Sequence, residues 1–291
     1  QLFRSLMTPL GLTLVLVAAL CHATWNFFVK RINGGPELVW LFSALSKVLY
    51  LPLAIAIVVL QEVTLDLEQS LFIAGSVALH LAYVMLLQAG YRNGDLSLVY
   101  PMARATGPLL STTFAVFFLG ETVTAQMGLG AGVIICGVLF LTGGIGPRAA
   151  NISVSLSFGL GVGLLIGGYT VWDAHAVATL LVPPLLLDYA ASVGRAVLLA
   201  PIALRRRAAV IGHWREHRTG VLAIAVLSPL AYILVLHAPT FTPVAYVAPL
   251  HEVSVLLTLL AASLLLGEGR LRPRLIWSAV IVGGVVLLAQ G

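Results

Sequence analysis

The sequence consists of apolar runs of about 20 residues separated by short polar links, and this pattern constrains the fold more than any other feature. A run of that length lets an α-helix cross the hydrocarbon core of a membrane. The 291-residue chain is 60% hydrophobic and 9% charged, whereas soluble domains carry roughly 25% charged residues. A water-soluble core could not hide so much apolar surface. The sequence therefore indicates an all-α integral membrane protein.

We predict ten membrane-spanning helices. They cover residues 9–29, 36–60, 71–90, 97–119, 124–143, 155–177, 183–204, 219–238, 243–266 and 273–289. The longest link, residues 205–218, leaves no room for a soluble domain. Residues 1–291 are therefore interpreted as a single transmembrane domain, with the lipid bilayer as its surroundings.

Lysine and arginine residues outside the predicted spans lie almost entirely on one side of the membrane. Eleven of them follow odd-numbered spans, Arg274 at the start of the tenth span lies on the same side, and only Arg4 lies on the opposite side. Since basic links stay in the cytoplasm, we predict that both termini lie outside it, and we expect the cytoplasmic (inner) membrane of a bacterium. The net charge of +5 is explained in this way and indicates no nucleic-acid partner.

Three short motifs occur in both halves of the chain. They are Trp25-Asn26 with Trp172-Asp173, Leu81-Ala82-Tyr83 with Leu230-Ala231-Tyr232, and Leu119-Gly120-Glu121 with Leu266-Gly267-Glu268. Their spacing of 147 to 149 residues indicates a duplication, so we predict a first five-helix repeat at 9–146 and a second at 155–290. Because five is odd, the repeats enter the membrane in opposite directions. Transporters built from such inverted repeats commonly bind substrate between them.

Small residues and helix ends give predictions about packing. Glycines recur every four residues at Gly159, Gly163 and Gly167, and again at Gly128 and Gly132. We expect both sets to allow close approach of helix backbones. Glu121 and Glu268 precede spans 5 and 10, where we expect the helix dipole to favour a carboxylate.

Three segments resemble a known family. They are FLGETVTAQMGLGAGVIICGVLFL, its second copy LLGEGRLRPRLIWSAVIVGGVVLLA, and the opening LTLVLVAALCHATWNFFVK. They resemble the EamA family of the drug/metabolite transporter superfamily, and the resemblance covers nearly the whole chain. It implies a ten-helix inverted-repeat carrier of small metabolites, and amino-acid exporters are prominent among its members.

Six charged side chains lie inside predicted spans and away from the span ends. They are Lys47, Arg104, Asp173, Asp188, Arg195 and Glu252. A charge in hydrocarbon is costly unless it faces a partner or a water-filled cavity, so these positions indicate a pathway for solute. Their charges sum to zero, which suits a zwitterion or an uncharged amphipathic solute better than a phosphate ester. Asp188 and Arg195 share a helix face, and a structural role for them and for Lys47 is the alternative.

We predict a substrate site from polar and aromatic residues in the spans. It comprises His80, Tyr83, Tyr100, Arg104, Trp172, His251 and Glu252. Aromatic rings can stack over an ammonium group, a contact of about 0.5 to 2 kcal/mol. Trp25, Asn26 and Asp173 are predicted as gate residues, with anchoring at the membrane interface as the alternative. We interpret Tyr169, Trp40 and Trp277 as interface anchors.

His251 and Glu252 follow Pro249, which, like Pro101, is expected to break its helix. Histidine titrates near neutral pH, so the pair could form the proton site of a coupled carrier. The alternatives are a structural hydrogen-bond network and a facilitator without a coupling ion.

The function predicted from these features is a secondary transporter that exports amino acids or similar small metabolites by alternating access. Two alternatives stay open: a phosphorylated or nucleotide-linked metabolite exchanger, favoured by Arg104 and Lys47, and an intramembrane lipid-modifying enzyme. No nucleophile-base grouping or His-Glu-x-x-His motif supports the enzyme. Cys21 and Cys136 lie within spans, so we expect neither a disulfide nor a metal site, and no cofactor. Monomer and homodimer are both compatible with the sequence.

Overall fold

The computed structural model describes residues 8–93, 96–141, 152–265 and 271–290, and the regular elements within these ranges are helices. Their bounds are α1 Pro9–Ile32, α2 Pro36–Leu60, α3 Leu67–Asn93, α4 Leu96–Leu119, α5 Ala125–Leu141, α6 Ile152–Ala178, α7 Pro184–Arg205, α8 Arg207–His237, the short 3₁₀ helix η2 Ala238–Thr240, α9 Val244–His251, α10 Val253–Leu265 and α11 Leu271–Ala289.

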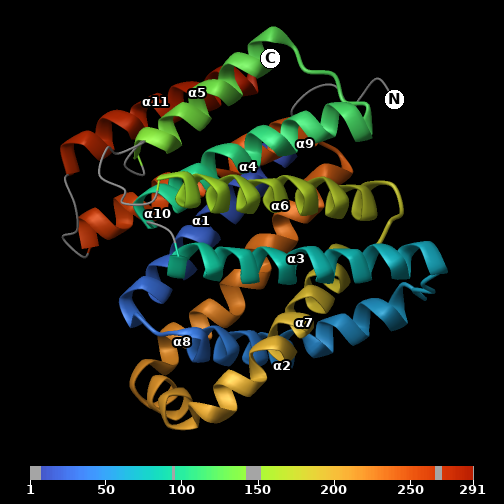
Figure 1. Cartoon of the computed structure of the whole chain (residues 1–291). Coiled ribbons are helices and arrows are strands. Elements are labelled where there is room, and N and C mark those ends of the chain that lie inside the picture. Colours follow the sequence, from blue (N-terminus) through green and yellow to red (C-terminus); the bar gives the residue numbers. More distant parts are fainter. Residues whose placement is uncertain (1–7, 94–95, 142–151, 266–270, 291) are drawn as a thin grey trace.

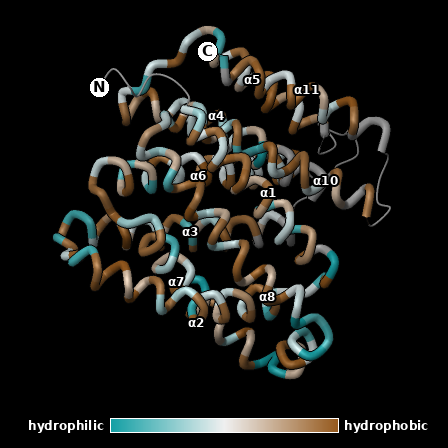
Figure 2. Tube along the Cα trace, turned by 180° about the vertical axis from the view of Figure 1, so that it is seen from behind, coloured by the Kyte–Doolittle hydropathy of each residue, from teal (hydrophilic) through white to brown (hydrophobic). Residues whose placement is uncertain are grey.

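Seven of the described helical segments are long and apolar enough to cross a membrane. Three shorter apolar segments, Ala125–Phe140, Val244–Thr258 and Leu275–Leu288, lie where we predicted spans 5, 9 and 10. Large apolar side chains point outward, among them Leu60, Phe117 and Phe118, which are 82%, 78% and 75% exposed. Figure 2 shows hydrophobic residues along the helices and a hydrophilic region where α7 passes into α8. This surface fits lipid rather than water.

The two halves of the chain interleave instead of forming separate bundles. Helix α1 packs on α8 and α10, while α6 packs on α3 and α4. The helices α5 and α11 lie side by side along one edge of the bundle, and α2, α7 and α8 form the opposite edge (Figure 1). The ten-crossing topology and the repeat boundaries stay predictions.

The segment 205–218, predicted as a link, is largely helical. Helix α8 begins at Arg207 and is kinked at His217, whose backbone has φ −130° and ψ 27°. The segment is fastened to the start of α2, because Glu37 pairs with Arg206 at 3.2 Å and lies 3.7 Å from His213. Hydropathy did not reveal this helix since its residues are largely polar.

The glycine predictions hold for α6 and fail for α5. A Cβ atom at Gly159, Gly163 or Gly167 would run into α4, so these glycines let the two backbones meet. In α5, a Cβ built at Gly132 would meet no atom of another helix within 4 Å among the described residues. Gly130 and Gly137 face α11 instead, where a Cβ would meet Leu288 and Ile281. The short helix carries glycines on two faces, and the position of α11 decides which of them packs against a neighbouring helix.

We expected Glu121 to stabilise the start of α5, but it caps the start of α9 instead. Its two carboxylate oxygens accept hydrogen bonds from the N–H groups of Val244 and Ala245 at 2.7 and 2.8 Å. The N-terminus of α5 is capped by Thr124, whose hydroxyl accepts from the N–H of Met127 at 3.1 Å. Glu121 thus joins the end of α4 to the second half of the chain. Glu268 lies outside the described residues.

Candidate functional site

A cavity of about 500 Å³ lies between helices of both halves. Its polar and aromatic lining consists of His22, Trp25, Asn26, His80, Tyr83, Arg104, Ser111, Tyr169, Thr170, Asp188, Arg195, Ser228, Tyr232, His251, Glu252, Ser254 and Thr258. These side chains come from α1, α3, α4, α6, α7, α8, α9 and α10, with Glu252 between the last two. The cavity therefore combines charges of both signs with aromatic rings inside an otherwise apolar bundle.

An ion pair between Arg104 and Glu252 forms the first charged feature of the cavity. The Nε atom of Arg104 lies 3.2 Å from Oε2 of Glu252, and their side chains are only 17% and 4% exposed. Glu252 is the residue between α9 and α10, three positions after Pro249, where a helix break was expected. Its carboxylate lies in the cavity wall. The two residues are 148 positions apart, within the 147 to 149 residues predicted for the repeat. If the predicted repeat is correct, the pair joins equivalent positions of the two halves.

Aromatic and imidazole rings surround this pair on α1 and α9. The ring centroid of His22 lies 4.9 Å from that of Trp25 and 5.1 Å from that of His251, both in edge-to-face geometry. The side-chain amide of Asn26 donates to the carbonyl of His22 at 2.9 Å, within α1. Rings arranged in this way can contact either an apolar side chain or an ammonium group.

A second polar cluster joins three helices. The hydroxyl of Tyr232 on α8 contacts Oδ2 of Asp173 on α6, and it lies 3.1 Å from Nε2 of His80 on α3. The other ring nitrogen of His80, Nδ1, lies 2.9 Å from the carbonyl oxygen of Ser76. The ring of Tyr169 packs on His80, with centroids 4.3 Å apart. Asp173 is 0% exposed and lies behind Tyr232 rather than in the cavity lining.

The charged residues of α7 form a third group. Asp188 and Arg195 line the cavity, and the guanidinium of Arg195 donates weakly to the hydroxyl of Ser192 at 3.5 Å. Lys47 on α2 lies outside the lining, with its Nζ 4.7 Å from the ring centroid of Tyr189. Lys47 interacts electrostatically with both Asp188 and Arg195. This arrangement supports the structural role considered for Lys47.

Most of the predicted site residues come together in the cavity. His80, Tyr83, Arg104, His251 and Glu252 line it, as do the predicted gate residues Trp25 and Asn26. The side chain of Tyr100 lies outside the described part of the chain. That these residues bind substrate, or form a gate, stays a prediction.

The structure corrects the prediction for Trp172, which does not line the cavity. Its indole N–H donates to the carbonyl of Phe72 at 2.8 Å, and its ring stacks on that of Phe72 with centroids 4.3 Å apart. Gly75 leaves room for the indole, since a Cβ there would collide with it. Trp172 therefore packs α6 against α3.

Sequence reasoning missed Tyr169 and Tyr232. Tyr169 was interpreted as an interface anchor, but it lies nine residues before the end of α6 and its ring contacts His80 and Tyr83. Tyr232 was not included among the predicted site residues, although the predicted repeat makes it the counterpart of Tyr83. The shared Leu-Ala-Tyr motif was a signal that could have identified it.

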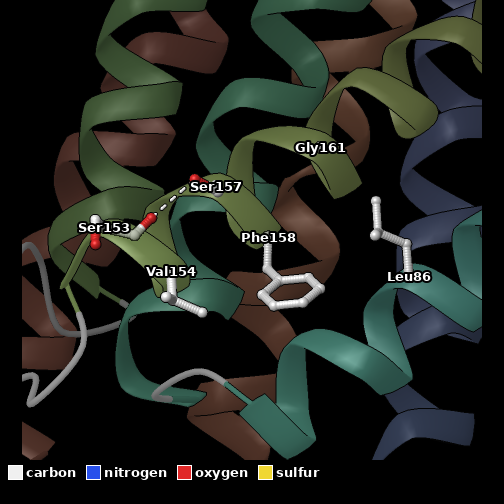
Figure 3. A pocket seen from close by; sticks show the side chains of 6 residues that line it. All are labelled: Leu86, Ser153, Val154, Ser157, Phe158 and Gly161. Atoms are coloured by element: carbon white, nitrogen blue, oxygen red, sulfur yellow. Dashed lines mark hydrogen bonds between the residues drawn. The ribbon is translucent and has the colours of Figure 1, made fainter.

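A second hollow, of about 430 Å³, lies on the surface between α3 and α6 (Figure 3). It is lined by Leu86, Ser153, Val154, Ser157, Phe158 and Gly161. Of these, Ser157 donates to the carbonyl of Ser153 at 2.9 Å within its own helix. None of the six side chains is titratable, so we place the functional site in the central cavity.

The comparisons with known proteins agree with the helical fold. A solved structure, described only as the crystal structure of a protein, is similar with a TM-score of 0.75 and 16% sequence identity over 96% of each chain. None of the curated proteins compared matches the chain at a significant level. The model of the EamA-like transporter family matches residues 9–143. Residues 9–143 are thus similar to the EamA-like transporter family, which is part of the drug/metabolite transporter superfamily.

Proposed function

We propose that this protein is a secondary transporter that exports amino acids or similar small zwitterionic metabolites across the cytoplasmic membrane by alternating access. The observation that carries the proposal is the contact between Arg104 and Glu252 in the wall of the cavity. A zwitterion presents a carboxylate and an ammonium group, and these could pair with the guanidinium and the carboxylate respectively. The adjacent rings of Trp25 and His251 would contact the rest of the solute.

The size and charge of the cavity favour this solute class over a phosphorylated one. A volume of about 500 Å³ lies within the roughly 300 to 1,000 Å³ of small-molecule sites. A phosphate ester would need cations that are not already neutralised, but Arg104 is paired with Glu252. Lys47, the other residue that favoured phosphate, lies outside the cavity lining and against Tyr189. The similarity of residues 9–143 to a transporter family favours a carrier over the intramembrane enzyme.

Helix packing supports the alternating-access part of the proposal. If α1 to α5 correspond to α6, α7, α8, α9 with α10, and α11, then each contact should have a repeat-related counterpart. The contact of α3 with α6 has its counterpart in α1 with α8, and that of α4 with α6 has its counterpart in α1 with α10. The contacts of α2 with α7 and α5 with α11 are their own counterparts. Two such halves can exchange conformations and open the cavity to either side.

Transport into liposomes tests the proposal. Purified protein is reconstituted into vesicles loaded with one unlabelled amino acid, and uptake of labelled neutral amino acids is compared with uptake of sugar phosphates. We expect exchange of neutral amino acids, and at least about a tenfold loss in Arg104→Gln because the buried pair is broken. Arg207→Gln, at an exposed arginine outside the cavity, is the matched control. Exchange of sugar phosphates without amino acids would contradict the proposal.

A further inference from the structure

We propose that His80, Tyr232 and Asp173 form a proton-binding site that couples transport to a pH gradient. The inference rests on the proposed function, since it assigns the coupling ion of that carrier. It also differs from the sequence analysis, which considered His251 and Glu252 as a proton site, with a structural network and a facilitator without a coupling ion as the alternatives. The hydrogen bonds of this cluster require a definite number of protons.

The direction of the bond from His80 to Ser76 is fixed by chemistry. A carbonyl oxygen can only accept, so the contact of 2.9 Å between Nδ1 of His80 and the oxygen of Ser76 requires a proton on Nδ1. The remaining nitrogen, Nε2, faces the hydroxyl of Tyr232 at 3.1 Å. A neutral imidazole has only one proton, so Nε2 then acts as an acceptor.

The two contacts of Tyr232 need two protons between them. A phenol has one O–H, which can serve either Asp173 or His80 but not both. Both bonds form in two arrangements. In the first, a protonated Asp173 donates to Tyr232, which donates to neutral His80. In the second, protonated His80 donates to Tyr232, which donates to the Asp173 carboxylate. The two arrangements hold the same number of protons and differ by a shift of two protons along the chain.

Removal of one proton leaves Asp173 ionised and His80 neutral, and one hydrogen bond is lost. The hydroxyl of Tyr232 then keeps its bond to the carboxylate, because hydrogen bonds to an ionised group are stronger than neutral ones. The bond between Tyr232 and His80 is the one that breaks. This bond links α3 of the first half to α8 of the second. Proton release therefore loosens a contact between the halves that must move in alternating access.

The surroundings favour the uncharged arrangement when the proton is bound. Asp173 is fully buried, and its carboxyl group meets the neutral hydroxyls of Tyr232 and Ser76, with His80 3.8 Å away. Tyr169 packs on His80 from α6, while Asp188 and Arg195 on α7 act on His80 with opposite signs. A separated pair of charges in this site would carry a large desolvation penalty.

Asp173 differs from the carboxylates of Glu252 and Asp188 in the charge of its partners. Glu252 pairs with the guanidinium of Arg104, and Asp188 interacts with Lys47 and Arg195. A fixed cation beside a carboxylate favours its ionised form, whereas burial opposes it. Asp173, by contrast, contacts the uncharged hydroxyl of Tyr232, and the histidine 3.8 Å away, His80, can itself lose its charge. Of the three carboxylates, Asp173 is thus the one for which the structure records no fixed cation as a partner.

The first experiment detects the proton directly and does not depend on transport. Infrared difference spectra of the purified protein are recorded across a pH step to find the carbonyl band of a protonated carboxyl group. We expect a band that disappears as pH rises in the wild type and is absent in Asp173→Asn. Glu252→Gln keeps the band. If the band persists in Asp173→Asn, or is lost in Glu252→Gln, the assignment to Asp173 is overturned.

The second experiment measures coupling in proteoliposomes. An imposed pH gradient should accelerate amino-acid uptake by about tenfold or more in the wild type. Asp173→Asn can keep both hydrogen bonds through its amide N–H but cannot release a proton, so it should lose the acceleration while equilibrium exchange stays measurable. Tyr232→Phe should also lose it. Tyr50→Phe, which removes a tyrosine bond of 2.7 Å to the carbonyl of Val226 on α8, is the matched control and keeps it.

The two experiments separate failure of this inference from failure of the proposed function. Amino-acid exchange without any effect of the gradient would overturn the coupling site and leave the carrier assignment standing. A titrating band from Asp173 in a protein that exchanges no amino acid would overturn the proposed substrate class instead. The proton site would then be tested with whichever solute is exchanged, by the same comparison of Asp173→Asn with Tyr50→Phe.

Discussion

At the scale of single residues, the pair of Arg104 and Glu252 illustrates how the bundle tolerates charge. Each ion alone would carry a penalty of several kcal/mol for leaving water, and the contact at 3.2 Å offsets much of it. The same closeness makes the pair suitable for a zwitterion, because either partner can be exchanged for the oppositely charged end of a solute. The pair is therefore expected to be more important for keeping the cavity intact than for net stability.

This view predicts a definite order of stability among three variants. Arg104→Met should lower the free energy of unfolding by about 3 to 5 kcal/mol, since it leaves the Glu252 carboxylate buried without its cation. The double variant Arg104→Met with Glu252→Gln should recover most of that loss. Thermal unfolding in detergent, followed by circular dichroism, gives the order. A double variant no more stable than Arg104→Met would show that the unpaired charge is not the cause.

At the scale of helices, the contact between α4 and α6 depends on the absence of side chains. A Cβ at Gly163 would overlap the Thr106 side chain and lie 3.2 Å from the backbone nitrogen of Gly107. Lipid gives no hydrophobic drive for helix association, so close backbone packing has to supply the stability. On the same helix, a Cβ built at Gly168 would meet no atom of another helix within 4 Å in the described part of the chain.

The two glycines give a matched test of this packing. Gly163→Ala should destabilise the protein by about 1 to 3 kcal/mol, because α4 and α6 must separate to admit the methyl group. Gly168→Ala should be neutral or stabilising by up to about 1 kcal/mol, since alanine favours a helix over glycine. Unfolding by increasing dodecyl sulfate measures both. Equal effects of the two changes would contradict a packing role specific to Gly163.

The same helices show what could be inferred from sequence at this scale. Spacing alone predicted the glycine face of α6, because its three glycines share one helical stripe that meets α4. It failed for α5, where Gly132 faces away and Gly130 meets α11. It failed also for Glu121, whose partners are backbone N–H groups more than 120 residues away. A local rule about helix ends cannot find a cap that arises from the meeting of two distant segments.

At the scale of the whole molecule, helix ends that lie together at one end of the bundle face the same side of the membrane. The start of α1 lies beside the end of η2, because the hydroxyls of Thr8 and Thr242 are 2.9 Å apart. The Glu121 carboxylate after α4 meets the start of α9 at this end of the bundle. Since the basic residues cluster at the opposite helix ends, we expect this end to face away from the cytoplasm.

A reporter fusion tests that orientation. Alkaline phosphatase, which is active only outside the cytoplasm, should be active when fused after residue 291, and a fluorescent protein that folds only in the cytoplasm should stay dark there. A fusion within the basic segment 205–218 should give the reverse result. Activity of the phosphatase in that segment would invert the orientation of the bundle and the direction proposed for transport.

For the whole molecule, hydropathy predicted the helical class. The polar residues inside the predicted spans indicated a central site, and most of those predicted for it line one cavity in the structure. The residues that were misassigned, Trp172 and Tyr169, are both amphipathic rings on α6. Such a ring can anchor at the interface, pack between helices or line a cavity, and its sequence position does not distinguish these cases. Only the neighbours decide: Gly75 makes room for Trp172 between helices, whereas His80 holds Tyr169 at the cavity.

The proton count of the His80, Tyr232 and Asp173 cluster has an electrical consequence. If one proton enters for each zwitterion that leaves, every cycle moves one positive charge inward, because the zwitterion carries no net charge. A membrane voltage alone would then drive export, with about 2.3 kcal/mol per 100 mV, or roughly a fiftyfold concentration ratio. A potassium diffusion potential applied to liposomes at equal pH on both sides should drive net amino-acid movement. That current should vanish in Asp173→Asn, because the amide neither binds nor releases a proton and its charge therefore does not change during the cycle.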